Sequence, residues 1–118
     1  MLMTVTSVPP TASPTPVPIY HAPPYTVAIE AGRGAFVVKS GAEGVYVAAV
    51  ASSGLGVALK IDDGARRAAE TVMAALLRHL GALDGKAQAA LEPYLDRPVP
   101  DRAGVRVGSI GVAKGWLE

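Results

Sequence analysis

The prolines of this 118-residue chain are unevenly placed, and their placement limits how much of the chain can fold. Seven of the ten prolines lie before residue 25. Each proline removes a backbone N–H donor and biases the preceding residue toward extended conformations. We therefore predict that residues 1–30 form a disordered or polyproline-like leader. The remaining part, roughly 90 residues long, is small for a stable single core, so we expect it to depend on a further partner.

Three short runs rich in apolar and β-branched residues follow the leader, at residues 35–38, 45–50 and 55–61. Glycine-containing turns separate them, which is typical of antiparallel strands joined by tight connections. The runs are almost continuously apolar instead of alternating. We therefore expect a sheet that is covered on both faces.

A helix is predicted after the third run, over about residues 64–80. Its apolar residues recur with a period of 3.6, at Ala65, Ala68, Ala69, Val72, Met73, Leu76, Leu77 and Leu80. An aspartate of Asp62-Asp63-Gly64 is expected to cap its start, and Gly81 to end it in the left-handed conformation. The predicted fold class is α+β: a three-stranded antiparallel meander with this long C-terminal helix packed on it.

The rest of the chain predicts little regular structure. A shorter helix is expected over about residues 86–91, ended by Pro93, which cannot donate a helical hydrogen bond. Residues 105–107 are the only strand-like piece after it. Arg66 and Arg67 fall in the first turn of the long helix, where the helix dipole disfavours cations. They form either a solvated pair or a pair that faces a partner carboxylate.

Composition argues against several classes of protein. The formal charge of +1 comes from interspersed charges, so no basic stripe is available for nucleic acid. The absence of cysteine excludes disulfides and thiolate chemistry, and His21 and His79 lie in unrelated segments, so no metal or cofactor is expected. The chain has neither a signal-peptide pattern nor an apolar stretch of about 18 residues. We therefore expect a soluble cytoplasmic protein that contacts no membrane.

The segment Lys39-Ser40-Gly41 carries the chemistry suggested by the sequence. It resembles the Lys-Thr/Ser-Gly signature at the sheet edge of serine hydrolases whose nucleophile lies in a Ser-x-x-Lys motif. A glycine at such a position lets a substrate approach the strand backbone closely. Asp62-Asp63 could suggest a metal loop, but two adjacent carboxylates fall short of the six to eight oxygens that Ca²⁺ takes, so capping is the preferred interpretation.

A wider resemblance extends from residue 34 to about residue 110, leaving residues 111–118 as a tail. It rests on KSGAEGVY from Lys39, LGVALKIDDG from Leu55, RAAE from Arg67, the leucines before Gly81, and GVRVG from Gly104. These segments resemble the C-terminal part of the bacterial asparaginase II family. That family is similar to the Ser-x-x-Lys hydrolases, so the resemblance also implies a fragment of a β-lactamase-like architecture.

The resemblance implies hydrolysis of L-asparagine to L-aspartate and ammonia. It makes Lys39 the active-site strand lysine, and Ser40 the hydroxyl where the family usually has threonine. Gly41 becomes the close-approach position of the substrate site. Glu43 also matches the family pattern and is assigned to substrate binding, with an exposed turn carboxylate as the alternative.

One departure from the family weakens the expectation of activity. None of the six serines is followed by a lysine three residues later, so the chain contains no Ser-x-x-Lys. We expect an asparaginase fragment that is inactive alone, or a small subunit that completes a site with a separate chain. The alternatives are a noncatalytic self-association module and a fragment of a penicillin-binding or β-lactamase-type hydrolase.

Overall fold

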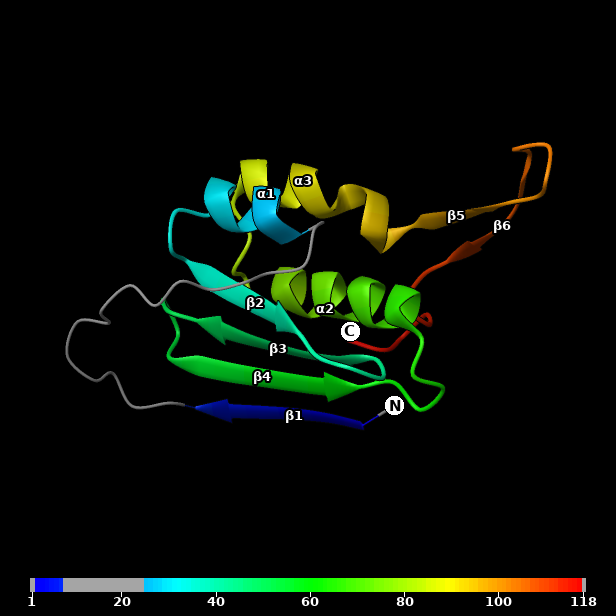
Figure 1. Ribbon diagram of the computed structural model, residues 1–118. Coiled ribbons are helices and arrows are strands. Elements are labelled where there is room, and N and C mark those ends of the chain that lie inside the picture. The colour runs from blue at the N-terminus through cyan, green and yellow to red at the C-terminus, as the bar shows by residue number, and fades with distance from the viewer. Residues whose placement is uncertain (1, 8–24, 118) are drawn as a thin grey trace.

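In the computed structural model of the chain, residues 2–7 and 25–117 are described. Their helices and strands follow in chain order: β1 (Leu2–Ser7), α1 (Tyr25–Ala31), β2 (Phe36–Ser40), β3 (Val45–Val50), β4 (Leu55–Lys60), α2 (Arg66–His79), α3 (Gly85–Leu95), β5 (Arg97–Pro100) and β6 (Arg106–Ile110). The α+β class and the three-stranded antiparallel meander β2-β3-β4 are confirmed. Figure 1 shows α2 directly over this sheet, with α1 and α3 side by side above it.

The N-terminal strand β1 extends the meander to a four-stranded sheet of order β1-β4-β3-β2. It pairs antiparallel with β4, from Leu2 opposite Lys60 to Ser7 opposite Leu55. The predicted disordered leader therefore differs from the structure at β1 and at α1, both of which are ordered elements before residue 32. The rest of that leader, residues 8–24, lies outside the described residues.

Among the described residues, the sheet buries one face only. Large side chains such as Phe36, Tyr46 and Leu59 point toward the helices and are 1 to 2% exposed. Successive strand residues point to opposite faces, and on the other face of β3 Val47 is 43% exposed. The prediction of two covered faces is therefore wrong for the described part of the chain. The near-continuous apolarity came from small residues on the second face, which remain accessible.

The long helix α2 confirms the predicted helix, with a start two residues later than expected. Its N-cap is Ala65, which makes no side-chain cap. The predicted aspartate cap is wrong, because Asp63 lies two residues before the cap position and its Oδ1 accepts from the Ala65 N–H at 2.8 Å. The predicted stop is confirmed: Gly81 follows the helix with a φ of +71°.

The shorter helix α3 is longer than predicted. It begins after Asp84, whose Oδ1 accepts from the Ala87 N–H at 2.8 Å. The helix continues through Pro93, so the predicted end before this proline is wrong. Pro93 lies in the last turn, where one intrahelical bond is lost, and buried Leu91 and Leu95 hold this turn on the core.

A two-stranded hairpin, β5-β6, projects from the end of α3 away from the sheet and helices (Figure 1). The sequence predicted strand structure only at residues 105–107, because Pro98 and Pro100 obscured β5. Both strands of such a ribbon are edges, where proline is tolerated. Beside and within β6, Val105 and Val107 are 59% and 66% exposed, so the hairpin adds little to the core.

Candidate functional site

The predicted strand lysine and hydroxyl lie at the end of β2, an edge strand of the described sheet. Lys39 is exposed on the open face, and its Nζ donates to the Ser40 carbonyl oxygen at 2.5 Å. Ser40 is half-buried and lies directly opposite Tyr46, so these two residues share the helix-covered face. The structure therefore places Lys39 and Ser40 next to each other but on opposite faces.

The two remaining predicted residues lie in the β2-β3 turn. The Gly41 N–H donates to the Val45 carbonyl at 2.7 Å. Glu43 is exposed, has a φ of +59°, and accepts through its carbonyl oxygen from Lys60 Nζ at 2.6 Å. The Glu43 backbone is thus part of the turn, and the geometry fits an exposed turn carboxylate.

The same turn touches the loop that leads into α2. Gly44 has a φ of +73°, a region that favours glycine. A Cβ atom on Gly44 would lie 3.0 Å from the Gly64 carbonyl carbon and 3.1 Å from Ile61 Cβ. The turn after the Lys-Ser-Gly segment can therefore approach the start of α2 only because no side chain stands at position 44.

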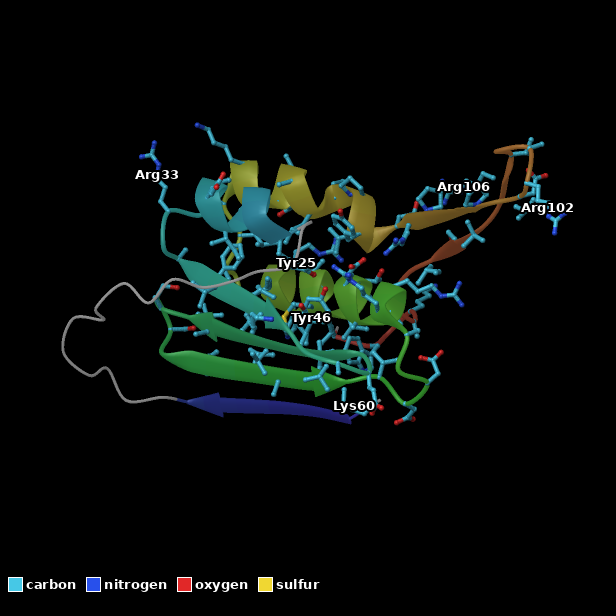
Figure 2. All side chains as sticks on the ribbon, viewed as in Figure 1. Tyr25, Arg33, Tyr46, Lys60, Arg102 and Arg106 are labelled. Atoms are coloured by element: carbon cyan, nitrogen blue, oxygen red, sulfur yellow. The ribbon has the colours of Figure 1, made fainter. Side chains whose placement is uncertain are left out.

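Sequence reasoning missed a polar cluster around Glu70, a side chain of α2 that is only 5% exposed. Its Oε1 accepts from Arg66 Nε at 2.9 Å, and its Oε2 accepts from Arg97 Nη1 at 2.5 Å. Tyr46 Oη donates to Oε1 at 3.5 Å, and Tyr25 Oη donates to the Glu70 backbone carbonyl at 2.5 Å. Figure 2 shows both tyrosines inside the body of the molecule.

Burial and neighbouring charge keep both phenols protonated. Burial is the main cause that raises the pKa of Tyr25, and Tyr46 and Glu70 raise it further. Burial likewise raises the pKa of Tyr46, with the charge of Glu70 second. Both tyrosines therefore remain hydrogen-bond donors to Glu70, and the cluster ties α1 and β3 to α2.

The cluster is bordered by an open hollow of about 490 Å³, lined by Ala65, Arg66, Arg67, Glu70 and Arg97. Arg97 also stands over the ring of Tyr94, with its Cζ 6.0 Å from the ring centroid. The spacing of Arg66 and Glu70, four residues apart on a helix, is the one signal by which the sequence could have indicated this pair. Arg97 comes from β5 and could not be found in this way.

Comparison with known families decides which kind of protein this is. The sequence profile of the family described as L-asparaginase II matches residues 21–112, which is most of the chain. The chain belongs to the L-asparaginase II family. No curated protein matches the chain. The matched region begins before α1 and runs past β6, so it includes more of the chain than the predicted resemblance from residue 34 to about residue 110.

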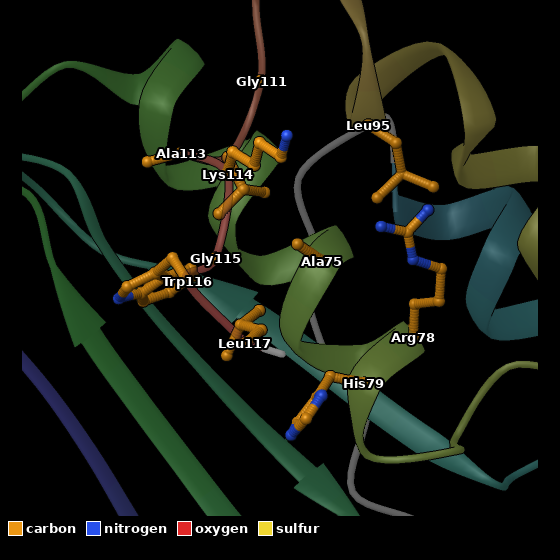
Figure 3. A pocket seen from close by; sticks show the side chains of 11 residues that line it. Ala75, Arg78, His79, Leu95, Gly111, Ala113, Lys114, Gly115, Trp116 and Leu117 are labelled. Atoms are coloured by element: carbon orange, nitrogen blue, oxygen red, sulfur yellow. The ribbon is translucent and has the colours of Figure 1, made fainter.

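This member of the family has a second hollow, of about 310 Å³, between α2 and the C-terminal segment (Figure 3). Arg78, His79, Lys114 and Trp116 are among its lining residues, which include no hydroxyl and no carboxylate. Among the described residues, this hollow therefore offers no serine or threonine that could serve as the nucleophile of a serine hydrolase.

The described residues show neither a metal-binding cluster nor a membrane-spanning helix. Within residues 2–7 and 25–117, no group of three or more histidine, aspartate or glutamate side chains could hold a metal ion. Over the same residues, no helix is both long and apolar enough to cross a membrane.

Proposed function

We propose that this chain is the C-terminal part of an L-asparaginase, which hydrolyses L-asparagine to L-aspartate and ammonia, and that it is inactive alone. The observation that carries the proposal is the match to the L-asparaginase II family over residues 21–112. The position of Lys39-Ser40-Gly41 on an edge strand supports it, because an edge strand leaves room for a substrate or a further segment to lie alongside.

In this proposal, Lys39 supplies an ammonium that binds a carboxylate or moves a proton, and Ser40 supplies a hydroxyl. Gly41 keeps the strand end open, and Glu43 borders the substrate site from the turn. The nucleophilic serine comes from a Ser-x-x-Lys segment outside these 118 residues. Its oxygen attacks the side-chain amide carbon, ammonia leaves with the transferred proton, and water then releases aspartate from the acyl-enzyme.

The test is an ammonia assay on the purified chain with L-asparagine. We expect no release above background, because none of the six serines lies in a Ser-x-x-Lys motif. A complete family enzyme, assayed at the same concentration, is the positive control. Turnover by the 118-residue chain that disappears in its Lys39→Ala variant would contradict the proposed inactivity.

A second candidate function is a noncatalytic module that self-associates. The observation that favours it is the exposure of Val47 on the open sheet face and of Val105 and Val107 on the hairpin. Sedimentation over a range of concentrations separates the two proposals. Concentration-dependent association together with no activity after addition of a Ser-x-x-Lys chain would favour the module.

A further inference from the structure

The hollow above Glu70 carries more positive charge than the buried carboxylate requires. Its lining holds three guanidinium groups, those of Arg66, Arg67 and Arg97, and one carboxylate, that of Glu70. These four side chains therefore sum to +2. The carboxylate is already matched at both oxygens, by Arg66 at Oε1 and by Arg97 at Oε2.

Donors remain on two of these arginines. A guanidinium has five N–H donors, and Arg97 gives one nitrogen to Glu70 while its side chain remains 37% exposed. Arg67 is exposed and makes no ion pair or hydrogen bond with any other described residue. Its charge stands in the first turn of α2, where the helix dipole disfavours a cation. The N–H groups of Arg67 and the remaining N–H groups of Arg97 are therefore not needed by Glu70, whose two oxygens are already paired.

We propose that this hollow binds a small oxyanion, a carboxylate or a phosphate, through Arg67 and Arg97. The buried carboxylate of Glu70 holds Arg97 in position through their ion pair, and Tyr46 in turn donates a hydrogen bond to Glu70. The planar guanidinium fork matches either kind of oxyanion. The hollow is open to solvent, so an anion can reach these guanidinium groups without any rearrangement of the fold. The proposal does not depend on asparaginase activity, because an inactive chain can still bind an anion.

The experiment is a titration of the full chain with L-aspartate and, separately, with inorganic phosphate, followed by backbone amide chemical shifts. We expect saturable shifts at residues 65–70 and at Arg97 with at least one of the two ligands. Arg67→Gln should raise Kd about tenfold, the loss of one charge-assisted hydrogen bond. Arg67→Lys keeps the charge but loses the planar fork of donors. Its Kd should lie between that of Arg67→Gln and that of the unchanged chain.

The matched control is Arg102→Gln, at the tip of the β5-β6 hairpin (Figure 2), because it removes the same charge far from the hollow. We expect its Kd to equal that of the unchanged chain. Arg67 has no described partner, so its variants should keep the fold, which the dispersion of the amide spectrum checks. Saturation by L-aspartate alone identifies a carboxylate site, and saturation by phosphate alone a phosphate site. No saturation by either, or equal weakening by Arg67→Gln and Arg102→Gln, overturns the proposal.

Discussion

The two faces of the sheet differ in what they contribute. The helix-covered face carries Phe36, Tyr46 and Leu59, all nearly inaccessible, and it leads through Tyr46 to the buried Glu70. The open face carries Lys39 and the half-exposed Val47, with no helix over them in the described part of the chain. The strand β2 therefore serves stability on one side and presents Lys39, the lysine of the proposed site, on the other. Substitutions on the two faces should have different readouts.

The largest expected effect is on the covered side. Leu77 of α2 is 0% exposed in the core cluster, so Leu77→Ala should lower the free energy of unfolding by about 3 kcal/mol, within the range of buried leucine truncations. Val47→Ala on the open face should cost less than about 1 kcal/mol. Urea unfolding monitored by circular dichroism measures both. Equal losses in the free energy of unfolding for the two variants would contradict the view that only the covered face stabilises the fold.

The next effect is on catalysis and tests the open face. In a chain complemented to activity, Lys39→Ala should lower kcat/KM by about 100-fold, as expected for a positioned electrostatic or acid-base group. Lys60→Ala is the comparison variant, because Lys60 also lies in a strand and could compete for this role, although its Nζ donates to the Glu43 and Ile61 carbonyl oxygens. The assignment to Lys39 fails if Lys60→Ala abolishes activity while Lys39→Ala does not. If, in addition, Ser40→Ala leaves kcat/KM unchanged, the resemblance to the Lys-Thr/Ser-Gly enzymes should be dropped as well.

A smaller effect concerns alkaline pH and the covered side. The pKa values of Tyr25 and Tyr46 are raised in the folded chain, whereas an unfolded tyrosine titrates near pH 10. Above that pH the unfolded state loses its protons first, so it binds fewer protons than the folded state. The contribution of these two phenols to the free energy of unfolding is therefore fully present below about pH 10 and is lost as the pH rises beyond it.

Tyr46→Phe tests this origin of the alkaline loss. At neutral pH it should cost about 1 kcal/mol, the worth of one hydrogen bond, and it should make the fall of stability above pH 10 shallower. Urea unfolding at a series of pH values provides the measurement, with the exposed-face variant Val47→Ala as the control. An unchanged slope in both Tyr46→Phe and Tyr25→Phe would show that the buried phenols do not cause the loss.

The smallest effect is expected for Val47→Thr, a substitution of similar shape on the open face. It should change the free energy of unfolding by less than about 0.5 kcal/mol, as is usual for surface positions. The same variant also tests self-association, which sedimentation measures. If the open face mediates self-association, the hydroxyl should weaken the association constant although the fold is unaffected, and an unchanged constant would exclude Val47 from that interface.

Much of the fold could be predicted because its signals are local. The three strands of the meander follow from β-branched runs between glycine turns, and α2 follows from its apolar period and from Gly81. The prolines explain most of the differences: those near β1 and in β5 obscured strands, and Pro93 suggested an end that burial of Leu95 overrides. Apolar periodicity also could not show that the second face stays open, since that depends on what else packs there.

The candidate site was predictable only where its residues are contiguous. Lys39-Ser40-Gly41 can be recognised in the sequence, and strand alternation alone would have separated Lys39 from Ser40. The Glu70 cluster joins residues that lie far apart, since Arg97 is 27 and Tyr25 is 45 positions from Glu70. No spacing rule relates such positions, because tertiary packing of α1, α2 and β5 brings them together.

The contact between Gly44 and Gly64 has a mechanical consequence. The turn that closes the Lys39 strand and the loop that opens α2 meet backbone to backbone, with no flexible side chain between them to absorb a displacement. A side chain at position 44 would have to displace one of these two backbone segments. The two loops are in this sense one packed unit, in which the end of the Lys39 strand and the start of the Arg66-bearing helix hold each other in place.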